Sequence, residues 1–173
     1  MDKKLIYTIG HSTRPIEEFL SLLQSFNIAL VADVRQFPGS KKFPQYNQQE
    51  LKEYLSMNNI QYIHFPDLGG RRKAEKESKN TAWRHAAFRG YADYMETEAF
   101  RQAIQRLEAT ALQRPTAYMC SEAVWWRCHR ALISDYLKCH GWEVLHIMDP
   151  AKAKEHPYTA PANIRQGQLT YIP

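Results

Sequence analysis

Short apolar runs alternate along this chain with segments whose apolar residues recur at helical spacing. A brief apolar and β-branched run bounded by Gly, Pro or polar residues is typical of a buried strand. Recurrence every three or four residues is typical of an amphipathic helix. Strands that alternate with helices predict right-handed crossovers and a mostly parallel sheet covered on both faces. The sequence therefore predicts an α/β fold with about five strands, Rossmann-like in the loose sense.

The expected elements fill most of the chain. Strands are predicted at Leu5–Ile9, Ala29–Val34, Gln61–Phe65, Thr116–Met119 and Trp142–Ile147. Helices are predicted after Thr13 and at Gln48–Met57, Ala86–Met95, Thr97–Leu112 and Cys128–Cys139. Two segments lack this regularity. The basic stretch Gly69–His85 has few apolar residues and predicts a mobile loop or a frayed helix, and residues 149–173, with a small hairpin near Gly167, predict an irregular tail packed on the domain.

Composition limits the class of protein. A chain of 173 residues with 44% hydrophobic content is enough for one domain, residues 1–173, with its own core. Its longest apolar runs fall far short of the roughly 20 residues that cross a bilayer, and we expect no membrane span. No secretory signal is evident, and three cysteines are an odd number, so we expect reduced thiols and a cytoplasmic protein. The net charge of +5 is compatible with a nucleic-acid partner.

Each predicted strand is followed by residues capable of chemistry. The first strand leads into His11 and Ser12, and the second into Asp33 and Arg35. The later strands lead into Gly69 and Gly70, into Cys120, Ser121 and Glu122, and towards His146. In an open parallel sheet, ligands bind outside the carboxyl ends of the strands. The sequence therefore predicts one site at this edge of the sheet.

Several of these residues have a purely structural interpretation as well. His11 and Ser12 suit a helix cap. Asp33 and Arg35 suit a structural ion pair, although two such residues on one strand face also suit a ligand clamp, which we favour. For His146 and Cys139 we favour packing in the core.

The densest constellation runs from Cys120 to Arg130, and three chemistries fit it. Cys128, predicted at a helix start between Arg127 and His129, suits a thiolate nucleophile, with Glu122 or His129 as acid or base. Cys120, Cys128 and His11 offer ligands that zinc or iron accepts, but no Cys-x-x-Cys occurs. Arg35, Arg127 and Arg130 suit an anion. The spacing from Cys120 to Arg127 does not match the Cys-x5-Arg loop of tyrosine phosphatases, because six residues separate them instead of five. Trp125 suits either packing or stacking on a base.

A resemblance to a known family adds to these observations. The motifs that carry it are Thr8-Ile9-Gly10-His11-Ser12, Asp33-Val34-Arg35, Pro38 with Ser40, Leu68-Gly69-Gly70, Phe88 with Tyr91-Ala92-Tyr94-Met95, Met119-Cys120-Ser121-Glu122, Cys128-His129-Arg130 and Val144-His146-Ile147. In this order they resemble the family called domain of unknown function 488, over nearly the whole chain. The resemblance implies an α/β fold and a shared site. Members are sometimes labelled as related to DNA repair, which favours a nucleic-acid or nucleotide partner.

Two hypotheses follow, from different classes of protein. The first is an enzyme that acts on a phosphate-bearing substrate. Its reactive or metal-binding set is Cys120, Glu122, Cys128, His129, Asp33 and His11, and its substrate-binding set is Ser12, Arg35, Gly69, Gly70, Arg127, Arg130 and Trp125. The second is a noncatalytic nucleic-acid or anion binding module with structural thiols. The oligomeric state, the reaction and the identity of any metal do not follow from the sequence.

Overall fold

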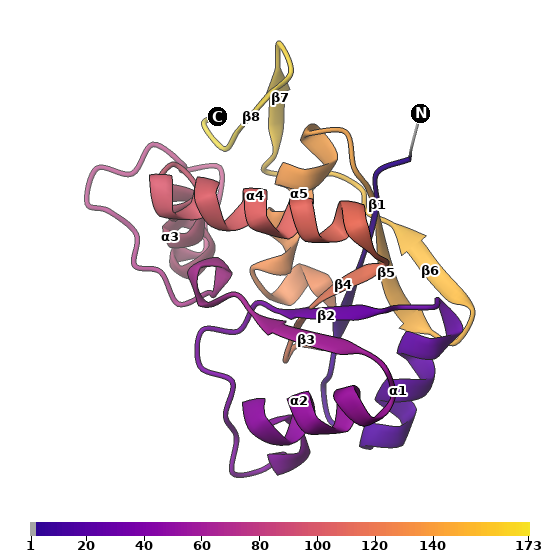
Figure 1. Cartoon of the computed structure of the whole chain (residues 1–173). Helices are drawn as coiled ribbons and strands as arrows, with labels where there is room; N and C mark the ends of the chain where they lie inside the picture. Colours follow the sequence, from indigo (N-terminus) through magenta and orange to yellow (C-terminus); the bar gives the residue numbers. More distant parts are fainter. Residues whose placement is uncertain (1–2) are drawn as a thin grey trace.

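A six-stranded sheet forms the centre of the molecule (Figure 1). The computed structural model describes residues 3–173. Its strands are β1 (Leu5–Gly10), β2 (Leu30–Asp33), β3 (Gln61–His64), β4 (Thr116–Cys120), β5 (Glu143–Asp149) and β6 (Lys152–Glu155). Their order is β3-β2-β4-β1-β5-β6, and the first five run parallel, whereas β6 pairs antiparallel with β5. The predicted α/β class with a mostly parallel sheet is confirmed.

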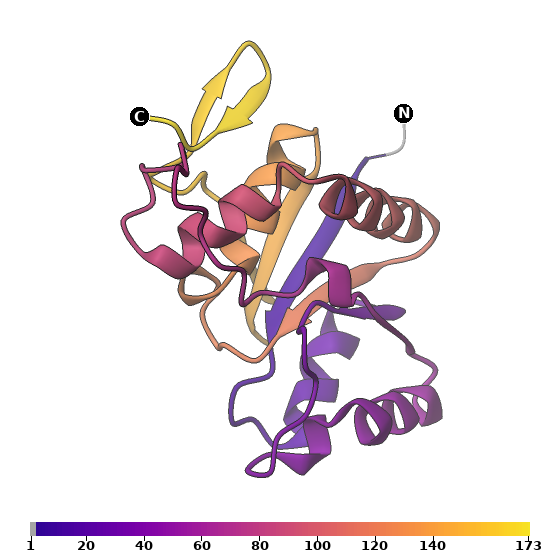
Figure 2. The same cartoon turned by 90° about the vertical axis from the view of Figure 1, so that its left-hand side faces the viewer.

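Helices cover both faces of this sheet (Figures 1 and 2). One face carries α1 (Ile16–Ser25) and α2 (Gln48–Met57), and the other carries α3 (Ala86–Tyr94), α4 (Glu98–Gln113) and α5 (Arg130–Cys139). Short 3-10 turns η1 (Pro44–Tyr46), η2 (Pro66–Leu68) and η3 (Trp125–Arg127) lie in the connections. Because successive strand residues point to opposite faces, the sheet separates two apolar cores. Val31 and Ala117 contribute to the core under α1 and α2, and Ala32 and Tyr118 to the other.

Two predicted segments differ from the structure. Helix α5 begins at Arg130 rather than at Cys128, because Cys128 has an extended backbone (φ −143°, ψ 176°) after the turn η3. Residues 149–173 are not wholly irregular, since β6 extends the main sheet along β5. The predicted hairpin near Gly167 is present as β7 (Asn163–Arg165) and β8 (Gln168–Thr170), and it projects from the body in Figure 2.

The basic segment Gly69–His85 forms no helix in the structure. It is nevertheless held by α3, because the carboxylate of Asp93 accepts hydrogen bonds from the backbone N–H of Glu75, the hydroxyl of Ser78 and the amide of Asn80, at 2.9, 2.6 and 2.7 Å. Burial opposes the charge of Asp93, but these hydrogen bonds outweigh it and lower its pKa.

The strand order sets the position of the site. Strand β4 lies between β1 and β2, so that Cys120 at its carboxyl end is flanked by the residues that follow both neighbours. The backbone N–H of His11 donates to the carbonyl of Cys120, and that of Val34 donates to the carbonyl of Met119, both at 3.0 Å. Within residues 3–173, no helix combines the length and the apolar character needed to span a bilayer.

Candidate functional site

A cavity of about 650 Å³ opens at the carboxyl ends of β1, β2 and β4. Its wall includes residues that follow all three strands, residues of the basic segment and of α3, and the turn before α5. Most of the predicted site residues line it: His11, Ser12, Arg35, Gly70, Cys120, Glu122, Arg127, Cys128 and His129. Its size is that of a site for a small organic ligand.

Two thiols lie side by side in this cavity. The sulfur of Cys120 is 2.9 Å from that of Cys128, and both residues are free cysteines. Cys120 is 2% exposed and Cys128 is 8% exposed. The two sulfurs are farther apart than the ~2.05 Å of a disulfide bond but share a hydrogen bond. The turn η3 makes this contact, because it folds the chain back over the end of β4 before α5 begins.

The buried guanidinium of Arg130 fixes the first thiol. Its Nε donates to the sulfur of Cys120 at 2.9 Å, one terminal nitrogen donates to the hydroxyl of Thr8 at 2.9 Å, and the other donates to the carbonyl of Glu122 at 2.7 Å. A Cβ on Gly10 would lie 1.7 Å from that carbonyl oxygen, so only glycine leaves room for this arrangement. Arg130 therefore contacts the thiol from within the protein rather than from the cavity.

The two thiols differ in acidity. Burial alone would raise the pKa of Cys120, but the hydrogen bond from Cys128 and the charge of Arg130 outweigh it and lower that pKa to about 7. Burial and the neighbouring Cys120 raise the pKa of Cys128 well above its usual value. Around neutral pH, a substantial fraction of the pair therefore consists of a Cys120 thiolate that accepts a hydrogen bond from the Cys128 thiol.

A chain of buried hydrogen bonds continues behind Arg130. Since Thr8 accepts from Arg130, its hydroxyl donates to Nδ1 of His146 at 2.6 Å, and Nε2 of His146 then donates to Nδ1 of His156 at 2.8 Å. Nε2 of His156 donates to Asp135 at 2.8 Å. The carboxylate of Asp135 can only accept, so Nε2 of His156 carries a proton, and the other bonds run in this direction when both rings are neutral. Burial, followed by the neighbouring His156, lowers the pKa of His146 to about 2, in keeping with its neutral form.

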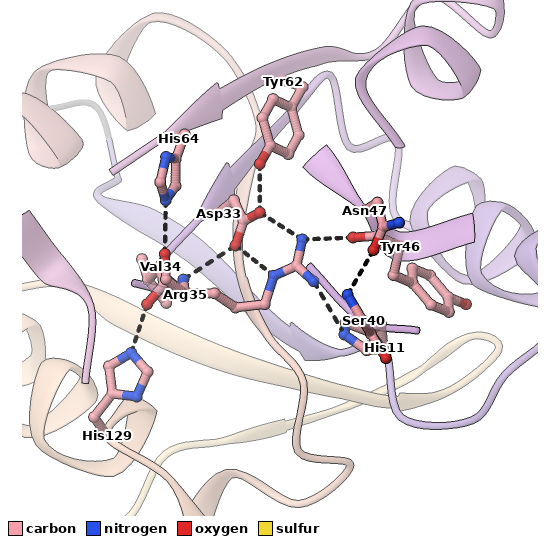
Figure 3. A network of polar contacts seen from close by, with 10 residues as sticks. All are labelled: His11, Asp33, Val34, Arg35, Ser40, Tyr46, Asn47, Tyr62, His64 and His129. Atoms are coloured by element: carbon pink, nitrogen blue, oxygen red, sulfur yellow. Dashed lines mark hydrogen bonds and ion pairs between the residues drawn. The ribbon is translucent and has the colours of Figure 1, made fainter. Parts of the chain in front are cut away.

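Asp33 and Arg35 form a buried ion pair (Figure 3). Arg35 donates to Asp33 from its backbone N–H at 3.0 Å and from its guanidinium at 2.9 and 2.7 Å, and the Tyr62 hydroxyl donates to the same carboxylate. A further bond of 2.8 Å joins Arg35 to the carbonyl of Tyr46. Asp33 is completely buried and does not line the cavity. Of the two interpretations, the structural ion pair describes this contact, with only Arg35 reaching the cavity.

Two neutral histidines flank the thiols. Nε2 of His129 donates to the carbonyl of Val34 at 2.7 Å, so that its Nδ1, which faces Gly70, is left as an acceptor. Nδ1 of His11 donates to the carbonyl of Ser12 at 2.8 Å, and its Nε2 lies 3.4 Å from Arg35. Burial lowers the pKa of each to about 4. At neutral pH both rings are therefore neutral, so they are weak bases and have no imidazolium proton to donate.

Charged side chains surround the cavity mouth. Arg71, Arg127 and Glu122 all line it and are exposed. Arg35 and Arg130 already face an anion inside the protein, so the arginines at the mouth supply the positive charge that a ligand meets. Apolar rings, including Phe37 and Phe88, complete the wall.

Four predicted site residues lie outside the cavity wall: Asp33, Gly69, Trp125 and Arg130. Trp125 stacks on His146, with ring centroids 4.7 Å apart, and packs edge-on against His156. These contacts agree with the packing interpretation of Trp125. A Cβ on Gly69 would lie 2.6 Å from the side chain of Gln36, so this glycine allows a close backbone approach.

The three candidate metal ligands do not gather into one set. The two thiols meet, but His11 is bonded to the carbonyl of Ser12 and approaches Arg35 instead. Within residues 3–173, no group of three or more His, Cys, Asp or Glu side chains is placed to hold a metal ion.

Sequence reasoning missed Thr8, Asp135 and His156. Asp135 had a usable signal, because it is a carboxylate within the mostly apolar run from Ala131 to Leu137 of a predicted helix, where a buried charge requires partners. Thr8 gave no signal, because a β-branched residue is ordinary in a strand. His156 gave none either, because it reaches Asp135 only once the C-terminal segment has folded onto α5.

The comparison with family models gives one match. The model described as Domain of unknown function DUF488 matches residues 15–137. The chain belongs to this family. The matched segment contains Asp33, Arg35, Cys120 and Cys128, whereas Thr8–Ser12 and the region around His146 lie outside it, so this match is shorter than the resemblance of the sequence motifs. No curated protein and no solved structure matches significantly.

Proposed function

We propose that this DUF488 protein is an enzyme in which the Cys120 thiolate attacks a phosphate-bearing substrate held in the cavity. The observation that carries the proposal is the hydrogen bond of 2.9 Å from the Arg130 Nε to the Cys120 sulfur. A buried cation that donates a hydrogen bond to a cysteine sulfur stabilises the thiolate, and the thiolate is the nucleophilic form of cysteine. A thiol with only a packing role needs no such partner.

The cavity mouth supports the choice of substrate. Arg71 and Arg127 present guanidinium groups that suit a phosphate, which they can bind through paired hydrogen bonds. A cavity of about 650 Å³ with apolar rings in its wall suits a nucleotide or the end of a nucleic-acid strand rather than a long duplex. In this proposal the arginines at the cavity mouth bind the phosphate of the substrate, and the Cys120 thiolate lies deeper in the cavity.

The chemistry is a substitution at the electrophilic centre of the substrate. A bond from the Cys120 sulfur to that centre forms as the bond to the leaving group breaks. The leaving group takes up a proton from solvent water, which the exposed carboxylate of Glu122 in the cavity wall can orient by accepting a hydrogen bond from it. The free Nδ1 of His129 accepts a proton from the water that later releases the adduct.

Comparing the binding of adenosine 5′-monophosphate with that of adenosine tests whether the protein recognises the phosphate group. The expected result is affinity for the nucleotide but not for the nucleoside, reduced roughly tenfold in Arg127→Ala by loss of a charge-assisted contact. Arg165→Ala, on the exposed hairpin β7, is the matched control and should bind like the wild type. Equal binding of nucleotide and nucleoside would contradict the proposal.

The thiolate is tested with Cys120→Ser. Across a panel of nucleotides, sugar phosphates and short oligonucleotides, we expect the wild type to consume one class, and the variant to bind that compound without consuming it. If both proteins bind and neither consumes any compound, the protein is instead a noncatalytic anion or nucleic-acid binding module.

A further inference from the structure

The contact between Cys120 and Cys128 also suits redox chemistry, which does not depend on the phosphate-bearing substrate. The sulfurs are 2.9 Å apart, one at the end of β4 and the other in the turn before α5. We propose that these two thiols are a redox-active couple that reduces small hydroperoxides, in which Cys120 attacks the oxidant and Cys128 closes an intramolecular disulfide.

The local hydrogen bonds assign the two roles. Arg130 donates to the Cys120 sulfur from its side chain, so negative charge is stabilised there. The Cys128 sulfur accepts a longer bond, of 3.4 Å, from the backbone N–H of Arg130 and keeps its own proton. The pKa of Cys120, lowered to about 7, and that of Cys128, raised by burial and by Cys120, agree with this division. Cys120 is the attacking sulfur and Cys128 the resolving one.

The small exposed fraction of both thiols favours a small oxidant. Only 2% of Cys120 and 8% of Cys128 is exposed, at the wall of the cavity. Attack on a disulfide requires three sulfurs in line and a bulky partner beside the thiolate. A hydroperoxide needs only one oxygen to reach the sulfur.

The reaction balances with the hydroperoxide as the only oxidant. The Cys120 thiolate attacks one peroxide oxygen; an S–O bond forms, the O–O bond breaks, and the leaving oxygen takes a proton to give an alcohol or water. The Cys128 sulfur then attacks the sulfenic acid of Cys120, an S–S bond forms, and the hydroxyl leaves as water with the proton of Cys128. The two sulfurs together lose two electrons, and the O–O bond gains them.

Closure of the disulfide needs little movement. The sulfurs must approach by less than ~1 Å to reach the bonded distance. Cys128 has an extended backbone outside α5, so it can move without unwinding the helix. Formation of the disulfide also removes the Cys120 thiolate, so the same oxidant would switch off the proposed substitution reaction.

The test is stoichiometric treatment of the reduced protein with hydrogen peroxide or tert-butyl hydroperoxide, followed by non-reducing peptide mass mapping. In the wild type we expect one disulfide, between Cys120 and Cys128. In Cys128→Ser we expect a sulfenic acid on Cys120 that is trapped by dimedone. Cys139→Ser is the matched control and should form the same disulfide as the wild type, because Cys139 lies elsewhere and donates to the carbonyl of Gly167.

Preferential oxidation of Cys139, with Cys120 and Cys128 still reduced, would overturn the proposal, as would Cys120 oxidised to a sulfinic acid without any disulfide. No phosphate compound is present in this experiment. A negative result here would therefore not affect the nucleotide-binding result. Equally, a protein that does not bind nucleotides can still form the disulfide.

Discussion

At the scale of single residues, Arg130 connects the thiol site to the interior. It is 1% exposed, and its three donor groups reach the sulfur of Cys120, the hydroxyl of Thr8 and the carbonyl of Glu122. Burying a guanidinium costs free energy unless each donor has a partner. The chain from Thr8 to Asp135 keeps one of these partners oriented, so residues that never touch the cavity position the charge beside the sulfur.

Replacing Arg130 tests this role. In Arg130→Met the positive charge is lost, so the pKa of Cys120 should rise above 7, and alkylation of Cys120 at pH 7 should slow roughly tenfold. Arg130→Lys keeps the charge without the fork of donors and should give an intermediate rate. The measurement is the rate of iodoacetamide labelling at the Cys120 peptide.

Two comparisons make the result specific. Arg165→Met on β7 should label like the wild type, because that arginine is exposed and distant in sequence from the thiols. If Arg130→Met does not fold, Arg130→Gln, which also removes the positive charge, takes its place. A rate equal to that of the wild type in the folded lysine variant and in the methionine variant would rule out electrostatic control by Arg130.

At the scale of elements, the basic segment depends on α3. Asp93 holds Glu75, Ser78 and Asn80, and a Cβ on Gly90 would lie 2.0 Å from the carbonyl oxygen of Arg72, so the segment packs tightly on this helix. The same segment carries Gly70 and Arg71 to the cavity wall. Anchoring by α3 therefore shapes one side of the site.

Asp93→Ala should loosen this segment. Three hydrogen bonds to a carboxylate are lost, each worth about 1–3 kcal/mol, so amide exchange in residues 71–80 should accelerate at least tenfold while that of the sheet changes little. Hydrogen exchange followed by mass spectrometry measures both regions. Glu77→Ala, an exposed carboxylate in the same segment, is the control. Unchanged exchange in Asp93→Ala would show that packing alone orders the segment.

The elements differ in how far the sequence predicts them. The predicted helix Gln48–Met57 is observed with the same bounds, because its apolar residues Leu51 and Leu55 mark one buried face. Strand β6 was missed because its sequence Lys-Ala-Lys-Glu belongs to an edge strand with little apolar content. The sequence predicts a mobile loop or a frayed helix for the basic segment, because its few apolar residues do not show that the carboxylate of Asp93 on α3 holds it in place.

At the scale of the whole molecule, parallel topology brings the site together. Residues after β1, β2 and β4 line one cavity, as the sheet-edge rule predicts. The rule gives the edge of the sheet but not the direction of each side chain. It therefore could not tell that Asp33 is sealed by Tyr62 and Arg35, or that Arg130 points inward to Cys120. The first contact depends on the pairing of β2 with β3, and the second on how α5 packs against the end of β4.

Both proposed reactions require a thiolate at Cys120 in the folded protein. The most direct test is the rate of iodoacetamide labelling of native wild-type protein from about pH 5 to about pH 10, read separately at each cysteine peptide. Labelling of Cys120 should rise with pH and reach half its maximum near pH 7, because the thiol loses its proton there. Cys139, whose pKa is raised chiefly by burial, should respond only at higher pH. A Cys120 that stays unreactive through neutral pH until the protein unfolds would contradict the account.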